Sequence, residues 1–128
     1  MTVLDASAVL ALLQDEPGAD IVEDAVDDGA IISTVNLADV LGKMVEAGAS
    51  VDHAADLVVG LFVDVEPCAL QAAVDSARSR AVTAKAGLSL GERVCLALAR
   101  SRDLPIVTAD RAWSALAEPL GLTVHASR

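Results

Sequence analysis

The sequence contains few aromatic residues and few cysteines. Its 128 residues include one Phe, one Trp and no Tyr. A single-strand binder that stacks bases on aromatic rings needs several such residues, and this chain has almost none to offer. Its two cysteines, Cys68 and Cys95, do not suffice for a disulfide framework and form no CxxC metal or redox motif. Because apolar residues flank both cysteines, we expect both to be small buried core residues.

Long apolar runs are absent as well. Although 54% of the residues are apolar, no run approaches the roughly 20 residues that a membrane span requires. The N-terminal stretch has no basic region and is interrupted by Asp5, so it does not resemble a secretory signal and we expect a cytoplasmic protein. The apolar content excludes a disordered chain despite the net charge of -10. The length fits one domain over residues 1–128.

Charge is distributed unevenly along the chain. Residues 1–77 carry 15 acidic residues and one basic residue, Lys43, whereas residues 78–128 carry 8 basic and 4 acidic residues. We expect folding to interleave the two halves, so that the asymmetry disappears in space. The alternative is a basic face for a phosphate backbone opposite an acidic face for a basic partner.

Short apolar or β-branched segments alternate with segments of helical periodicity. The expected strands are Thr2–Leu4, Ala30–Ser33, Val63–Val65, Ile106–Thr108 and Leu122–Val124. The expected helices are Ala6–Leu13, Pro17–Asp28 with Pro17 in its first turn, Thr34–Ala47, Val51–Phe62, 68–85, 89–102 and Arg111–Leu116. This alternation predicts an α/β domain with a mainly parallel central sheet and helices on both faces.

Four acidic residues fall at or near strand-to-helix junctions: Asp5, Asp39, Glu92 and Asp110. In open parallel sheets, sites lie outside the carboxyl ends of the strands, so these side chains are expected to converge. Converging carboxylates repel each other unless a divalent cation binds between them. An oxygen-only set favours Mg²⁺ or Mn²⁺ over zinc, and the isolated His53 and His125 are expected to be ordinary polar residues.

Helix capping is the structural alternative for each of these carboxylates. Asp5 and Asp110 fit N-cap positions, Ser89-x-x-Glu92 fits a capping box, and Asn36-x-x-Asp39 resembles the same device. Capping accounts least well for Asp5, which is the only charged side chain in the first 14 residues.

Four segments together resemble PIN-domain ribonucleases, specifically VapC-type toxins of bacterial toxin–antitoxin pairs. They are Val3–Ala8, Thr34–Lys43, Leu88–Arg93 and Leu104–Trp113, in the expected order, and the resemblance extends from residue 3 to about residue 125. It implies a PIN-like three-layer sandwich and a metal-dependent endoribonuclease that cuts single-stranded RNA. It also implies an antitoxin whose C-terminal segment lies across the active site, and a homodimer, for which the helices at 34–62 are one candidate face.

The resemblance implies roles for particular residues. Asp5 and Asp110 become the principal Mg²⁺ or Mn²⁺ ligands, with Glu92 and Asp39 binding directly or through water. Ser7, Asn36 and Thr108 orient these ligands, and Arg93 and Arg111 contact RNA phosphates. Turn and cap chemistry is the alternative role for Ser7, Asn36 and Thr108, and surface solvation is the alternative for the two arginines.

The sequence departs from the family pattern at two positions. The family usually has Glu where this chain has Asp39, and Asp where it has Glu92, so we expect the ion to be retained but shifted. Residues 111–114 lack the further acid that relatives often carry, which indicates one firmly held ion rather than two. A PIN-fold protein that binds RNA or a partner without cutting is the main rival. A haloacid dehalogenase-like phosphatase is disfavoured because Ser7 replaces its second Asp, and no glycine motif for nucleotide phosphates is present.

Overall fold

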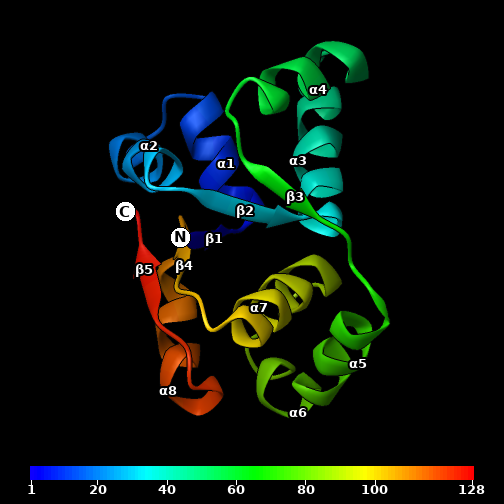
Figure 1. Ribbon diagram of the computed structural model, residues 1–128, viewed down its shortest axis with the longest axis vertical. Helices are drawn as coiled ribbons and strands as arrows, with labels where there is room; N and C mark the ends of the chain where they lie inside the picture. The colour runs from blue at the N-terminus through cyan, green and yellow to red at the C-terminus, as the bar shows by residue number, and fades with distance from the viewer.

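A five-stranded parallel sheet forms the middle layer of the protein (Figure 1). The computed structural model describes residues 1–128. The strands are β1 (Thr2–Leu4), β2 (Ala30–Ser33), β3 (Asp64–Glu66), β4 (Ile106–Thr108) and β5 (Val124–Ala126). Their spatial order is β3-β2-β1-β4-β5, and every neighbouring pair is parallel. The predicted α/β class with a parallel central sheet is therefore confirmed.

Helices cover both faces of the sheet, as predicted (Figure 1). One layer holds α1 (Ala6–Leu13), α2 (Ala19–Asp27), α3 (Thr34–Glu46) and α4 (Val51–Val59). The other holds α5 (Leu70–Arg78), α6 (Arg80–Thr83), α7 (Leu90–Arg102), the 3₁₀ helix η1 (Arg111–Leu116) and α8 (Ala117–Leu120). None of these helices has the length and apolar character needed to span a bilayer.

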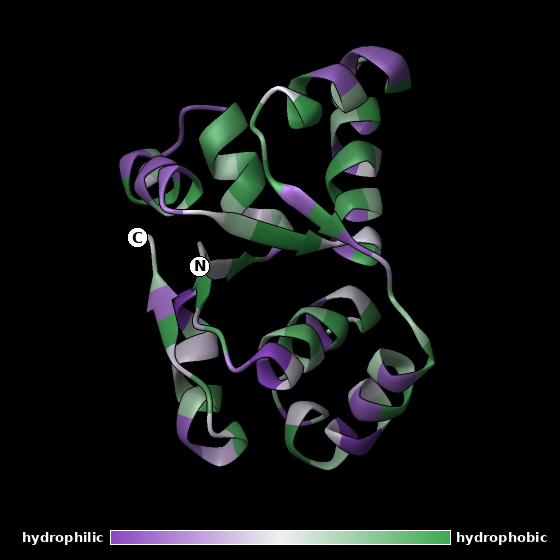
Figure 2. Ribbon diagram, viewed as in Figure 1, coloured by the Kyte–Doolittle hydropathy of each residue, from purple (hydrophilic) through white to green (hydrophobic).

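Two hydrophobic cores lie on opposite faces of the sheet. In β1, Val3 packs into the core under α7 while Leu4 packs into the core under α1. This division follows from strand geometry, because successive side chains of a strand point to opposite faces. Figure 2 shows α1 coloured as hydrophobic along most of its length, and this helix packs between α2 and α3. The two fully buried residues of β1 thus contribute to different cores.

Chain order explains which helices cover which face. The chain runs outward from β1 to β2 and β3, and then returns to place β4 and β5 on the other side of β1. Parallel crossovers are right-handed, so reversing the direction of travel moves the connecting helices to the opposite face. Helices α1 to α4 therefore lie on one side, and α5 to α8 on the other.

The same topology places most helices of the two parts on opposite faces, but three ion pairs join the two parts, Arg78–Asp75, Arg102–Glu66 and Arg128–Glu16, so the expected interleaving holds only in part. The helices before β3 come from the acidic part of the sequence, while those after it come from the part that carries 8 of the 9 Lys and Arg residues. Exposed acidic side chains line α2, and exposed basic side chains occur on α5, α6 and α7. The sheet stands between the two groups, so the linear asymmetry becomes a difference between two faces.

Two expected helices differ from the structure by two or more residues at one end. Helix α2 begins at Ala19 rather than Pro17, because Gly18 adopts a left-handed φ of +91° and the chain turns there. A Cβ at Gly18 would lie 2.1 Å from the Ser127 carbonyl oxygen, so the turn passes close to the C-terminal segment. Helix α4 ends at Val59 rather than Phe62, whose left-handed φ of +58° is incompatible with a continuing helix.

The segment 68–85 is two helices, α5 and α6, rather than one. The hydroxyls of Ser76 and Ser79 donate to the carbonyls of Ala73 and Ser76, and such side-chain bonds compete with the helical ladder. Helix α8 was not predicted, because Pro119 argues against a helix; it is tolerated there in the first turn, where N–H groups have no helical partner.

Two strands begin later than expected. Strand β3 starts at Asp64 rather than Val63, and β5 starts at Val124 rather than Leu122. Pairing with neighbouring strands sets both registers, with Ser33 opposite Glu66 and Ile106 opposite Val124. A three-residue strand offers too little periodicity for the sequence to define its ends.

Only one of the two cysteines is a core residue. Cys95 on α7 is fully buried, and burial raises the pKa of its thiol, with the nearby Asp5 and Glu92 carboxylates adding to the rise. Cys68 is only partly buried because it lies in the loop between β3 and α5, so the expectation of a buried residue there is wrong.

Candidate active site

The candidate site lies where the strand order reverses. Strands β1 and β4 are neighbours, and their following segments leave the carboxyl end of the sheet on different paths. Asp5 directly follows β1, and Asp110 lies two residues after β4. Ligands of open parallel sheets bind in the crevice at such a reversal point. The topology thus places the first and last predicted carboxylates beside the expected crevice.

All four predicted carboxylates line one pocket of about 400 Å³ at this point. Asp39 reaches it from α3 and Glu92 from the first turn of α7. The remaining lining residues are Ala6, Ser7, Leu10, Asn36, Lys43, Ser89 and Trp113. The structure therefore brings together side chains from four segments that are far apart in the sequence.

Asp5 is buried and held by several hydrogen bonds. Asp5 is only 4% exposed. One carboxylate oxygen accepts from the Ala8 backbone N–H (2.8 Å) and the Ser7 hydroxyl (2.8 Å), and the other accepts from the Thr108 hydroxyl (2.6 Å). Asp5 is therefore the N-cap of α1 and also part of the pocket, so the capping and site interpretations are compatible here.

Ser7 and Thr108 also join the ends of β1 and β4. The Thr108 hydroxyl accepts from the Asp110 backbone N–H (3.0 Å), and the Ser7 hydroxyl accepts from the Ala109 backbone N–H (3.0 Å). Asp110 in turn accepts from the Ala112 N–H (2.9 Å) and caps η1, while its side chain stays exposed. Two hydroxyls thus fix the spacing between the Asp5 and Asp110 backbones.

Asn36 connects α3 to α7. It is 1% exposed, its Nδ2 donates to the Gly91 carbonyl (2.9 Å), and its Oδ1 accepts from the Ser33 hydroxyl (2.5 Å). Ser33 rather than Asn36 caps α3, so the alternative that Asn36-x-x-Asp39 forms a helix cap is wrong. Asn36 fixes the helices that carry Asp39 and Glu92 and makes its bonds to Gly91 and Ser33 rather than to a carboxylate.

Gly91 allows α7 to approach α3 closely. A Cβ at this position would lie 2.2 Å from Asp39 Oδ2, well inside contact distance. The Asp39 carboxylate therefore occupies the space that a side chain at position 91 would need. Next along α7, the Ser89 hydroxyl caps the helix by accepting from the Glu92 N–H (3.2 Å), which is one half of the expected capping box.

Burial and mutual repulsion shift two of the carboxyl groups. Burial raises the pKa of Asp5 in spite of the hydrogen bonds from Thr108, Ala8 and Ser7, and the Asp110 charge raises it further. Partial burial raises the pKa of Glu92, and the charges of Asp110 and Asp5 add to this rise while the Ser89 bond opposes it. Burial is the larger cause of both shifts, and the smaller contribution from the neighbouring carboxylates is one that a bound cation would relieve.

A comparison with known families decides the assignment. The model of the PIN domain family matches residues 2–119. The chain belongs to the PIN domain family. No curated protein matches the sequence significantly.

Solved structures with the same PIN fold come from several bacteria. A chain of the DNA-bound VapBC from Salmonella typhimurium is 18% identical, with a TM-score of 0.73 and full coverage of both chains. A chain of VapBC-5 from Mycobacterium tuberculosis, a member of a toxin-antitoxin family, is 25% identical, with a TM-score of 0.62 over 98% of this chain and 97% of that one. A chain of FitAcB from Neisseria gonorrhoeae is 17% identical, with a TM-score of 0.69 over 99% and 98%.

The donor set of this PIN domain fits a hard cation by its chemistry. The pocket gathers only oxygen ligands, whereas His53 and His125 are exposed and lie outside its lining. In their present orientations, however, no three Asp, Glu, His or Cys side chains form a metal-binding group. Asp5, for example, uses both oxygens as hydrogen-bond acceptors. The carboxylates would therefore have to turn toward an ion that entered the pocket.

Lys43 is a pocket residue that the sequence reasoning did not select. It lies one helical turn after Asp39 on α3, and it lines the pocket, whereas Arg93 and Arg111 do not. Its ion pair with Glu46 spans 3.8 Å between exposed side chains and contributes little. The available signal was its position as the only base among residues 1–77, four residues after a predicted ligand.

Two buried donors near the site lack acceptors. Trp113 is 1% exposed and forms part of the pocket wall, yet its indole N–H has no hydrogen-bond partner, and neither does Nε of Arg93. An unpaired buried donor costs about 1–3 kcal/mol. The wall of this pocket is therefore not optimised for stability.

Proposed function

We propose that this PIN domain, spanning residues 1–128, is a metal-dependent endoribonuclease that cuts single-stranded RNA phosphodiesters. The observation that supports this most directly is the convergence of Asp5, Asp39, Glu92 and Asp110 on one pocket at the strand reversal point. The raised pKa values of Asp5 and Glu92, in a pocket that two further carboxylates line, are typical of a site that a divalent cation stabilises.

Asp5 and Asp110 are the proposed principal ligands of Mg²⁺ or Mn²⁺, and Glu92 and Asp39 complete the set directly or through water. Held by these residues, such an ion would supply the Lewis acidity needed to activate a water for attack on the phosphodiester and to stabilise the developing charge. Ser7 and Thr108 keep the Asp5 carboxylate oriented and fix its distance from Asp110 through their hydrogen bonds. Asn36 holds α3 against α7, and so keeps Asp39 and Glu92 on the same pocket.

Arg93 and Arg111 are proposed to contact RNA phosphates outside the pocket. Arg111 is exposed directly after Asp110, and Arg93 is partly buried next to Glu92. Their contribution is electrostatic and should weaken as salt increases.

The biological role proposed is that of the toxin in a toxin–antitoxin pair in the cytoplasm. The support is the likeness to chains of VapBC complexes over nearly the whole length. A VapB-like antitoxin would bring a basic segment to the acidic side, which the exposed carboxylates of α2 favour. A homodimer through α3 and α4 is supported by an apolar hollow of about 170 Å³ there, lined by residues such as Leu37, Val59 and Val65.

Cleavage of a labelled single-stranded RNA panel tests the proposal. The wild type should cut RNA with Mg²⁺ or Mn²⁺ and stop in EDTA, while Asp5→Asn should be inactive. Asp24→Asn on α2 is the matched control, because it makes the same change at an exposed carboxylate outside the pocket. Cutting that persists in Asp5→Asn would identify a contaminant, and no cutting by the wild type would reject the enzyme.

A PIN module that binds RNA or a partner without cutting is the second candidate. Two observations favour it: the exchanged side chains at Asp39 and Glu92, and the lack of three carboxylates already arranged around one point. Calorimetry with Mn²⁺ separates the two candidates, because the nuclease must bind the ion through Asp5, whereas this module need not.

A further inference from the structure

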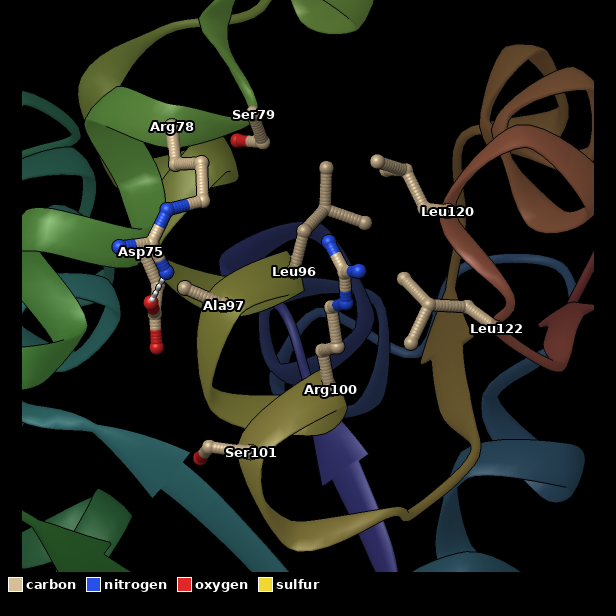
Figure 3. Close-up of a pocket in the computed structure, with 9 residues that line it drawn as sticks. All are labelled: Asp75, Arg78, Ser79, Leu96, Ala97, Arg100, Ser101, Leu120 and Leu122. Carbon is tan, nitrogen blue, oxygen red and sulfur yellow. Dashed lines mark hydrogen bonds and ion pairs between the residues drawn. The ribbon is translucent and has the colours of Figure 1, made fainter.

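A second pocket lies on the basic side of the molecule, away from the carboxylates. It encloses about 190 Å³ between α5, α7 and the α8 region (Figure 3). Leu96, Ala97, Leu120 and Leu122 form its apolar part, and Asp75, Arg78, Ser79, Arg100 and Ser101 form its polar part. No proposed metal ligand contributes to it, so it is a separate site.

Arg100 is the polar group in this pocket that has no ionic partner. Arg78 forms an ion pair with Asp75 (3.0 Å), and Arg102 at the same end of α7 pairs with Glu66, whereas Arg100 forms no ion pair. In Figure 3 the Arg100 side chain extends between Leu96 and Leu122, so its guanidinium stands against the apolar part of the pocket. The planar guanidinium of Arg100, next to the apolar side chains of the pocket, is thus available to bind a ligand.

The surroundings of the pocket favour an anionic ligand. Arg78, Arg80 and Lys85 follow one another along α5, α6 and the next turn, all exposed on this side of the sheet. With a net charge of -10, the rest of the molecule repels a polyanion, so this side is where RNA can approach. The Ser79 and Ser101 hydroxyls donate to backbone carbonyls, so the free donors are those of Arg100 and the part of the Arg78 guanidinium that does not bind Asp75.

We propose that this pocket binds one unstacked nucleotide of single-stranded RNA, with its base between the leucines and the Arg100 guanidinium and its phosphate toward Arg78. The inference rests on the proposed function, because it assigns a binding site to the same RNA substrate. Unstacked bases are gripped by aromatic rings or by arginine planes, and this chain has only one Phe and one Trp. Phe62 lies exposed after α4 and Trp113 is buried, so Arg100 supplies the plane.

The volume of the pocket agrees with the base of a nucleotide rather than with a whole nucleotide. Its volume is below the range of about 300–1,000 Å³ typical of larger ligands, and suits one ring system. Helix α7 connects the two sites, because Glu92 lies in its first turn and Arg100 in its last turn. Eight residues of helix span about 12 Å, so an RNA segment of a few nucleotides can reach both pockets.

RNA binding by fluorescence anisotropy in EDTA, where cleavage is not expected, tests this site. Arg100→Gln should weaken binding of a labelled single-stranded RNA about tenfold, as expected for losing one stacked base. Arg100→Lys keeps the charge without the plane and should restore only part of the affinity. Arg102→Gln is the matched control, since it removes the same charge from the same helix end but outside the pocket, and it should change binding less than about threefold.

If Arg100→Gln binds RNA as tightly as the wild type, or if Arg102→Gln weakens binding as much as Arg100→Gln does, the proposed nucleotide site is wrong. Neither result affects the proposed nuclease function. If the wild type neither binds nor cuts RNA, the proposed function itself is wrong, and the nucleotide site is wrong with it. Leu122→Ala gives an independent check, because it alters the apolar floor without changing charge and should also weaken binding. Thermal unfolding of each variant verifies that the fold is retained.

Discussion

Gly91→Ala is expected to remove activity without unfolding the protein. Gly91 lies in the first turn of α7, where its missing side chain leaves room for the Asp39 carboxylate. The added Cβ would stand 2.2 Å from Asp39 Oδ2 and 3.3 Å from its Cγ, while ordinary contact begins at 3.4 Å. To restore ordinary contact the oxygen must move away by 1.2 Å, the difference between 3.4 Å and 2.2 Å.

The two consequences of this change have opposite signs. Alanine is a better helix former than glycine by up to about 1 kcal/mol, and the clashing atom belongs to an exposed, movable side chain, so stability should stay constant or rise by a few degrees in Tm. A displacement of about 1 Å at a catalytic group can lower the rate about 100-fold. Mg²⁺ sites tolerate misplaced ligands poorly, so a loss of this size is expected here.

The assay is single-turnover RNA cleavage beside thermal unfolding, with Gly42→Ala as the matched control. Gly42 is also helical, but a Cβ there would meet nothing within 4 Å, and it does not line the pocket. The control should keep full activity and match or exceed the wild-type Tm. If Gly91→Ala cleaves RNA at the wild-type rate, Asp39 does not need its present position and is not a ligand.

Further predictions concern the charges and donors of the carboxylate pocket. The pKa of Asp5 is raised by burial, so its ionised form destabilises the folded state; Asp5→Asn should raise Tm at neutral pH, with a difference that disappears as pH falls below the ordinary Asp range. Since Asp5 and Glu92 both have raised pKa values in the metal-free protein, protons compete with the ion, so the affinity for Mn²⁺ should begin to fall at a pH above the range of free carboxyl groups, and a fall that begins only at ordinary values would contradict their role. Lys43→Gln should raise KM for RNA several-fold with little change in kcat, whereas Glu46→Gln, which removes its exposed ion-pair partner, should not; equal KM values would exclude substrate contact. Trp113→Phe removes a buried N–H that has no acceptor, and this gain offsets the cost of the smaller ring, so Tm should fall less than it does for an ordinary large-to-small core change, and a loss of the full size of such a change would mean that the donor is paired.

The sequence predicted the parts of this site that depend on strand ends. Asp5 and Asp110 follow short buried strands, and placing the carboxyl ends of parallel strands at one sheet edge was sufficient to bring them together. Lys43 was missed because its role depends on which side of α3 faces α7, and that is fixed by the Asn36 bond to Gly91, a contact between residues 55 positions apart. The limits of β3 and β5 were missed for the same reason, because pairing with neighbouring strands sets them.

The charge asymmetry shows what the order of strands adds to composition. From counts alone, an acidic first part and a basic second part are compatible both with mixed charges, which we expected, and with separated charges. Strand order decides between them: travel outward to β3 and then back past β1 assigns the acidic helices to one face and the basic helices to the other. The carboxylate pocket lies at the reversal point, so it meets both faces at the sheet edge. An anionic substrate approaching from the α5–α7 side and a basic partner approaching from the α1–α4 side would therefore compete for the same pocket without sharing the surfaces that attract them.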